Sequence, residues 1–161
     1  MLSTFLPLIY IQITPELLTV RNVKTGTTVA EVPELAISTS AKPVILAVGP
    51  QARLAAASEP ATVVNPFAHP RTLVSDFTVA EQLLKYQLRR VLKHSVWMPA
   101  PCVVMHPMGR SEGGYTQVER RAFREMALGA GASQVFLWIG RPLTDAELLL
   151  RRAPEGTGEW E

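Results

Sequence analysis

Short runs of apolar residues, many of them alternating with polar ones, recur along this chain and are separated by segments with helical spacing. Runs of this length are typical of strands buried on one or both faces. The predicted strands cover residues 8–13, 17–23, 27–32, 35–38, 44–48, 102–106 and 135–137. A short alanine-rich helix is predicted over residues 51–57, and the proline-containing residues 61–71 are predicted to be irregular. Because strands and helices alternate, the pattern predicts an α/β layer structure.

Three threonines are each followed three residues later by a glutamate, which is the spacing of a capping box at the start of a helix. The pairs are Thr78–Glu81, Thr116–Glu119 and Thr144–Glu147. The first opens a predicted helix over residues 79–93, and Gly129 and Gly131 are suited to end the second. We expect Leu84 and Ala122 to be largely buried, because each lies on the apolar face of its helix.

Composition narrows the class of protein. A length of 161 residues suits one domain, or two small lobes that share a core. The chain is 47% apolar and 19% charged, as soluble globular proteins are, and its net charge of +2 is too small to indicate a nucleic-acid partner. The single cysteine, Cys102, excludes an intramolecular disulfide and a cysteine-cluster metal site. The three histidines also lack metal-ligand spacing, so no metal site is predicted.

The first eleven residues are mostly apolar but have neither a positively charged start nor a clear cleavage site, so they do not match a signal peptide. They are also far short of the ~20 apolar residues that cross a bilayer. We therefore expect no transmembrane segment and a cytoplasmic location.

Residues 116–137 read TQVERRAFREMALGAGASQVFL, a complete unit of capped helix, glycine turn and strand. This string closely resembles the TQVERRA…GAGA..VFLIEEP segment of the MreB family, the bacterial actins that organise rod-shaped cells. Residues 75–84 and 97–104 resemble two further family segments, ADF.V.E.ML and F.RP.PRVLV, in the same order. The order and spacing of the three matches make chance similarity improbable.

The resemblance implies the actin/Hsp70 (ribonuclease H-like) fold, in which a mixed β-sheet is flanked by helices and carries a small inserted subdomain. It implies a single, truncated first-domain module over residues 1–153, with the inserted subdomain at about 33–71. Residues 154–161 are predicted to form a flexible tail.

The family's first phosphate loop reads DLGTAN.L, and this chain departs from it. Gln12 stands in the place of the aspartate that organises the water shell of the metal, and Thr14 stands in the place of a glycine. Pro15 has no N–H to donate to a phosphate, and Glu16 would repel one. The resemblance therefore implies a degenerate phosphate loop.

The family's catalytic glutamate comes from VFLIEEP, where it acts on the attacking water. When the two sequences are aligned on Pro142, Arg141 replaces this glutamate, and an arginine cannot serve as a general base. The glycine-containing residues 109–114 do not match a phosphate loop of the G-x-x-x-x-G-K-[ST] type. The family's second phosphate loop would lie beyond residue 161. We therefore predict no enzymatic activity, no catalytic residues and no cofactor.

The preferred hypothesis is a non-catalytic, MreB-like cytoskeletal protein related to cell shape. It would act as a homodimer, within an MreB-type filament, or by binding a true bacterial actin. Filament pairing in the family uses this subdomain, and a leucine-rich turn after Thr144 is expected to be exposed. The candidate partner surface comprises Val118, Arg121, Glu125, Leu148 and Leu149. Two alternatives stay open: an ATP-binding actin-family module, and a non-functional remnant.

Overall fold

The computed structural model describes residues 5–69, 74–93, 97–108 and 113–161. Most of the glycine-containing segment at 109–114, and His94, lie outside the described residues. The strands are β1 (Leu8–Ile13), β2 (Leu18–Asn22), β3 (Thr28–Glu31), β4 (Leu35–Ser38), β5 (Ile45–Val48), β6 (Ala61–Val64), β7 (Cys102–Pro107), β8 (Gln134–Gly140) and β9 (Gly158–Trp160). The helices are α1 (Gln51–Ser58), α2 (Phe77–Leu92), α3 (Gln117–Gly129) and α4 (Asp145–Leu150).

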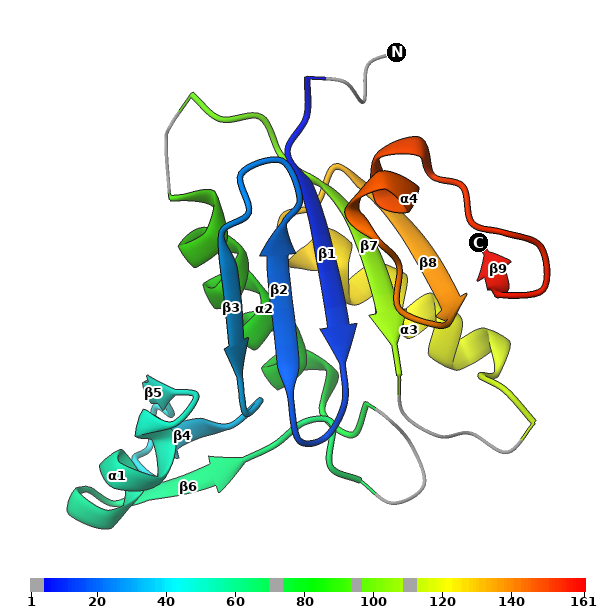
Figure 1. Ribbon diagram of the computed structural model, residues 1–161. Helices are drawn as coiled ribbons and strands as arrows, with labels where there is room; N and C mark the ends of the chain where they lie inside the picture. The colour runs from blue at the N-terminus through cyan, green and yellow to red at the C-terminus, as the bar shows by residue number, and fades with distance from the viewer. Residues whose placement is uncertain (1–4, 70–73, 94–96, 109–112) are drawn as a thin grey trace.

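Six strands form the main sheet in the order β3-β2-β1-β7-β8-β9. The β1–β7 and β7–β8 pairs are parallel and the other pairs are antiparallel, so the sheet is mixed, as expected. Helices α2 and α3 cover one face of this sheet, and the short helix α4 lies on the other (Figure 1). The carboxyl ends of β1, β7 and β8 therefore meet at one edge.

The larger core lies between the sheet and the two long helices. Alternate residues of β1, including Ile9, Ile11 and Ile13, point to this side and are fully buried. Leu84 of α2 packs in this core with no exposed surface, which confirms its predicted burial. On α3 the buried residues are Phe123, Met126 and Ala127, whereas Ala122 is only partly buried. Ala122 lies at the border of the buried face, because that face of α3 is centred on Phe123, Met126 and Ala127.

A second, smaller core lies on the opposite face of the sheet, beneath α4. It is built on Trp138 of β8 and Leu148 of α4, and Trp160 of β9 packs against it. The rings of Trp138 and Trp160 lie 4.9 Å apart between centroids. Cys102 is buried in the same core, and burial raises the pKa of its thiol, as expected for an inert cysteine.

The residues predicted to form a flexible tail include β9, so this prediction was wrong. β9 pairs antiparallel with β8, and Gly158 lies opposite Gly140. Arg120 of α3 holds the same segment through ion pairs with Glu159 (2.7 Å) and Glu161 (3.0 Å). The packing of the partly buried Trp160 on the second core and these ion pairs order a segment whose sequence is typical of a disordered end.

A separate three-stranded sheet, in the order β5-β4-β6, falls within the predicted insertion at about 33–71, and α1 packs on it. Figure 1 shows it set apart from the main sheet, at the end of β3. Strand β6 lies in a segment that was predicted to be irregular. Its extended conformation depends on pairing with β4, which the local sequence does not reveal.

The local start signals of the helices were mostly right. Complete capping boxes form at Thr116 and Thr144, as predicted. Helix α2 instead begins after Asp76, whose side chain accepts a hydrogen bond from the Val79 N–H, so Thr78 lies inside the helix. An aspartate two residues earlier was the stronger cap.

Candidate functional site

The turn between β1 and β2 is closed by its own hydrogen bonds. The Thr14 N–H donates to the Leu17 carbonyl at 3.0 Å, and the Leu17 N–H donates to Thr14 Oγ1 at 2.9 Å. Pro15 has no N–H, and its carbonyl accepts a 2.8 Å hydrogen bond from Asn65 Nδ2. The backbone donors of Thr14 and Leu17 are therefore already used, and Pro15 offers none.

Gln12 is the second-to-last residue of β1, and its side chain points toward the end of β7. Its Nε2 lies 3.4 Å from the sulfur of Met108, which follows β7. An amide carries no charge and cannot replace a carboxylate in organising the water shell of a metal ion. Glu16 is exposed at the tip of the turn and adds a negative charge there.

Arg141 follows β8 at the same edge and is held by α4. Its guanidinium binds both carboxylate oxygens of Glu147, at 2.5 and 3.0 Å, and also donates to the Pro142 carbonyl at 2.7 Å. Glu147 in turn accepts from the Thr144 N–H in the capping box of α4. The Arg141 hydrogen bonds, helped by the Thr144 N–H, lower the pKa of Glu147 to about 2. Arg141 therefore acts as a structural cation that fixes the start of α4.

A buried hydrogen-bonded chain joins β1, β7 and β8 just inside this edge. The Leu143 N–H donates to the Tyr10 hydroxyl at 3.1 Å, and that hydroxyl lies 2.6 Å from His106 Nδ1. His106 Nε2 lies 2.8 Å from the Gly140 carbonyl. A carbonyl only accepts, so Nε2 carries the proton and Nδ1 accepts from Tyr10.

The surroundings of Tyr10 and His106 favour the uncharged form of each side chain. Burial lowers the pKa of His106, and the hydrogen bond to the Gly140 carbonyl offsets part of that effect. Burial raises the pKa of Tyr10 to about 12. The sequence shows no metal-ligand spacing around His106 and indicates no other role for it, because its partner Tyr10 lies 96 positions away in the sequence. The one usable signal was a polar residue at an inward position of a buried strand.

The candidate partner residues do not form one surface. Val118, Arg121 and Glu125 lie along one exposed side of α3, and the side chain of Arg121 is 82% exposed. Leu149 is 55% exposed on α4, which packs on the opposite face of the sheet. Leu148 is 1% exposed and belongs to the second core, so its prediction as a partner residue was wrong. A helix of six residues can bury one side only, and Leu148 is on it.

The profile of the MreB/Mbl protein family matches residues 16–146, which is most of the chain. This chain belongs to the MreB/Mbl family. It is 36% identical over 102 residues to the cell shape-determining protein MreB of Haemophilus influenzae, a match that covers 63% of this chain and 28% of that protein. It is 44% identical over 75 residues to the cell shape-determining protein MreB of Escherichia coli strain K12, covering 46% of this chain and 20% of that protein. The chain thus spans less than a third of the length of these relatives.

Solved MreB structures share its architecture. Two crystal structures of MreB5 from Spiroplasma citri, one bound to AMPPNP and one to ADP, superpose on it with a TM-score of 0.64. Each match covers 82% of this chain at 20% sequence identity, with 38% of the AMPPNP-bound chain and 37% of the ADP-bound chain covered. The fold is therefore the actin fold, as the sequence resemblance implied.

Among the described residues, no group of three or more histidine, cysteine, aspartate or glutamate side chains is arranged to hold a metal ion. Within those residues, too, no helix is long and apolar enough to cross a membrane.

Proposed function

We propose that this chain is a non-catalytic MreB-type protein of the cell-shape cytoskeleton, which acts in the cytoplasm by associating with itself or with a complete bacterial actin. Family membership supports the cytoskeletal part of this proposal, because the relatives are cell shape-determining proteins. The non-catalytic part depends on the edge of the main sheet where β1, β7 and β8 end.

The observation that carries the proposal is the closed β1–β2 turn. A phosphate-binding turn needs backbone N–H groups directed at the ligand. Here the N–H groups of Thr14 and Leu17 donate within the turn, and Pro15 has none. The carboxylate of Glu16 adds repulsion. These features do not fit a bound nucleotide phosphate.

Arg141 supports the same conclusion from the other side of this edge. A catalytic base must accept a proton from water, and an arginine bound to both oxygens of Glu147 cannot do so. Arg141 therefore contributes to stability at this edge and not to hydrolysis.

Calorimetry with ATP and magnesium tests the absence of nucleotide binding. We expect no saturable heat and no change in the melting temperature at millimolar ATP, whereas a ligand at 100 times its Kd would stabilise the fold by about 2.7 kcal/mol. Saturable micromolar binding would overturn the proposal and favour a nucleotide-binding module. MreB5 of Spiroplasma citri, whose crystal structures contain AMPPNP or ADP, serves as the positive control.

Association is tested by sedimentation velocity at micromolar concentration, with the chain alone and mixed with a complete MreB. We expect either a dimer or a change in MreB assembly, and weakening of both by the double variant Val118→Asp, Arg121→Glu on the exposed side of α3. Lys42→Glu, an exposed position on the small sheet's hairpin, is the control. A strict monomer that leaves MreB assembly unchanged would overturn the association proposal and favour the alternative of a non-functional remnant.

A further inference from the structure

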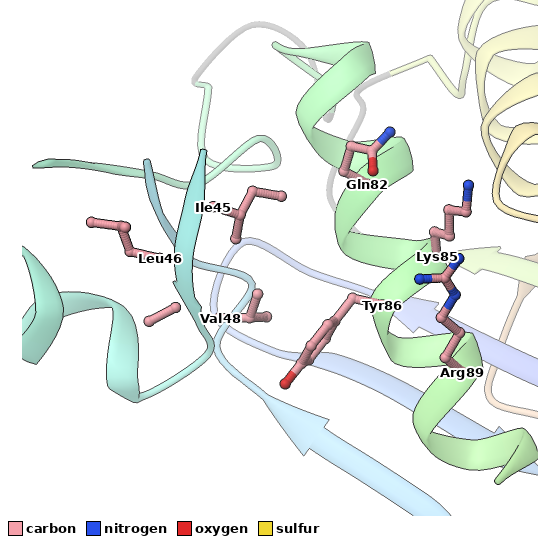
Figure 2. Close-up of a pocket in the computed structure, with 8 residues that line it drawn as sticks. Ile45, Leu46, Val48, Gln82, Lys85, Tyr86 and Arg89 are labelled. Atoms are coloured by element: carbon pink, nitrogen blue, oxygen red, sulfur yellow. The ribbon is translucent and has the colours of Figure 1, made fainter. Parts of the chain in front are cut away.

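A groove with a volume of about 350 Å³ runs between the small sheet and helix α2. Strand β5 forms one wall and contributes all four of its residues, Ile45–Val48. Helix α2 forms the other wall with Gln82, Lys85, Tyr86 and Arg89. Figure 2 shows Ile45 and Val48 directed from β5 toward α2, whereas Leu46 points away from it. The groove is separate from the β1–β2 turn and from the exposed side of α3.

The strand that borders this groove is an edge strand. Within the described residues β5 pairs only with β4, so the N–H and C=O groups of its other edge are left for another strand. Ile45 is 43% exposed, although it is an apolar residue in a strand. Four residues at about 3.3 Å each offer a ladder of roughly 13 Å. The wall of the groove is therefore long enough to pair with a short extended peptide.

An irregularity in β5 limits that pairing. The register shifts between the pairs Ala36–Ala47 and Ile37–Ile45, so Leu46 is an extra residue in β5. A bulge of this kind increases the local twist and disfavours long, indefinite strand addition. The edge is thus suited to a short, defined segment and not to open-ended aggregation.

The helical wall is positively charged. Lys85 and Arg89 are one helical turn apart, and no acidic residue lines the groove. In the described part of the chain neither cation has a carboxylate within 4 Å, whereas Arg90, one residue on, is paired with Glu31 at 2.7 Å. Tyr86 adds an aromatic ring that is 46% exposed, and the Arg90 guanidinium lies 5.8 Å from the centroid of this ring. The charge of the groove therefore selects an acidic occupant.

We propose that this groove binds an extended acidic peptide of a partner protein, which adds a short strand to the free edge of β5. Its backbone pairs with β5, its carboxylates are on the side chains that point toward α2 and lie beside Lys85 and Arg89, and its alternate apolar side chains point to the other side, where Leu46 lies. Backbone pairing supplies affinity and the alternate side chains supply specificity, as in other cases of strand addition to a sheet edge. The proposal goes beyond the proposed function, because it concerns a different surface and does not depend on nucleotide or filament formation.

The test uses three fluorescently labelled, capped heptapeptides and the full 161-residue chain. The first alternates glutamate and valine, the second alternates lysine and valine, and the third is the acidic peptide with its central residue replaced by proline. Anisotropy should show binding of the acidic peptide only, weakening as salt rises. Proline removes a ladder donor and should abolish that binding. In ¹⁵N spectra the shifted amides should cluster in β5 and in α2 from Gln82 to Arg89.

Charge reversal locates the site. Lys85→Glu and Arg89→Glu should each weaken binding of the acidic peptide about 5- to 10-fold, and the double variant should bind the lysine peptide instead. Arg152→Glu, an exposed position after α4, is the matched control and should change neither affinity. Thermal unfolding establishes that each variant is folded. Equal binding of the acidic and proline peptides, equal binding of the acidic and lysine peptides, or no binding of the acidic peptide at millimolar concentration would overturn the proposal.

Discussion

Gly140 and Gly158 lie opposite each other in the β8–β9 pair, and their backbones approach too closely for a side chain on either residue. A β-carbon on Gly140 would lie 2.4 Å from the Thr157 carbonyl oxygen and 2.6 Å from the α-carbon of Gly158. A β-carbon on Gly158 would lie 2.8 Å from the α-carbon of Gly140. These atoms are backbone, so they can move only if the two strands move apart, and the Trp138 side chain lies within 2.8 Å of either β-carbon as well. The docking of β9 therefore depends on the absence of two β-carbons.

Gly140→Ala should detach β9 and lower the free energy of unfolding by about 1–3 kcal/mol, the usual cost of overpacking. Hydrogen exchange should accelerate at the amides of Leu137 and Glu161, which bond across this pair. Gly129→Ala is the control, because there the β-carbon would meet only the flexible end of Glu81. Unchanged exchange at Leu137 in Gly140→Ala would contradict the proposed role of the close contact.

Tyr10→Phe should destabilise the fold although it removes a single oxygen atom. The change leaves the Leu143 N–H and His106 Nδ1 without their hydrogen-bond partner in a buried site. Each buried group that loses its partner costs about 1–3 kcal/mol. Urea denaturation measures the loss, and Tyr86→Phe, at an exposed tyrosine, should stay within about 0.5 kcal/mol of the parent. Equal stability of the two variants would mean that the buried hydrogen bonds that link Leu143, Tyr10, His106 and Gly140 do not contribute to the free energy of unfolding.

Stability should fall as the pH is lowered below the ordinary histidine pKa of 6.5. The pKa of His106 is lower in the folded protein, so below 6.5 the unfolded chain takes up a proton that the folded chain excludes. The contribution of neutral His106 is thus fully present above pH 6.5 and decreases below it. Denaturant unfolding between pH 7.5 and about 5 should show this slope, and His106→Gln should flatten it. An identical slope in both proteins would assign the effect to other groups.

Arg141→Gln should raise the pKa of Glu147 from about 2 toward its ordinary 4.5. The Arg141 guanidinium is the largest cause of the low value, and glutamine carries no charge to replace it. The stabilisation from this pair is present above pH 4.5 and is lost as the pH falls toward 2. Carboxyl-carbon NMR titration measures the change. Arg152→Gln is the control and should leave the pKa of Glu147 unchanged.

Two aspartate substitutions on α3 should differ sharply in cost. Ala127→Asp places a charge in the larger core and should lower the free energy of unfolding by about 3 kcal/mol or more. Ala122→Asp should cost roughly 1 kcal/mol, because Ala122 is only partly buried and its new carboxylate can reach water. Equal losses in denaturant unfolding would indicate that the exposed and buried sides of α3 are assigned wrongly.

Helix α3 illustrates where sequence reasoning succeeds and where it fails. The capping box at Thr116 involves residues three positions apart, so its outcome follows from the local sequence. The orientation of α3 depends on the strands beneath it, and an error of one position turns the expected face by about 100°. For the same reason Leu148 was predicted to be exposed, although it is buried while its neighbour Leu149 is not.

The candidate site divides in the same way. The substitutions Gln12, Thr14, Pro15 and Arg141 can be read directly in the sequence, because they are departures from a known pattern. The ion pair between Arg141 and Glu147 and the contact of Tyr10 with His106 depend on how α4 and three strands come together. The groove between β5 and α2 has one wall from a strand of the small sheet and the other from a helix on the main sheet, so no single stretch of sequence contains it.

By itself, the sequence determined the family, the strands with strong apolar patterns and the helix starts with complete caps, since each depends on residues close together in the chain. The tertiary structure alone decided the second core, the ordered β9 and the side of each helix that is buried. The physical reason is that these features arise from contacts between distant segments: Trp160 is ordered by Trp138, and β9 is held by Arg120. The segment that contains β9 is rich in glycine and glutamate, and it forms a strand because β8 offers a free edge, Trp138 an aromatic ring and Arg120 a guanidinium.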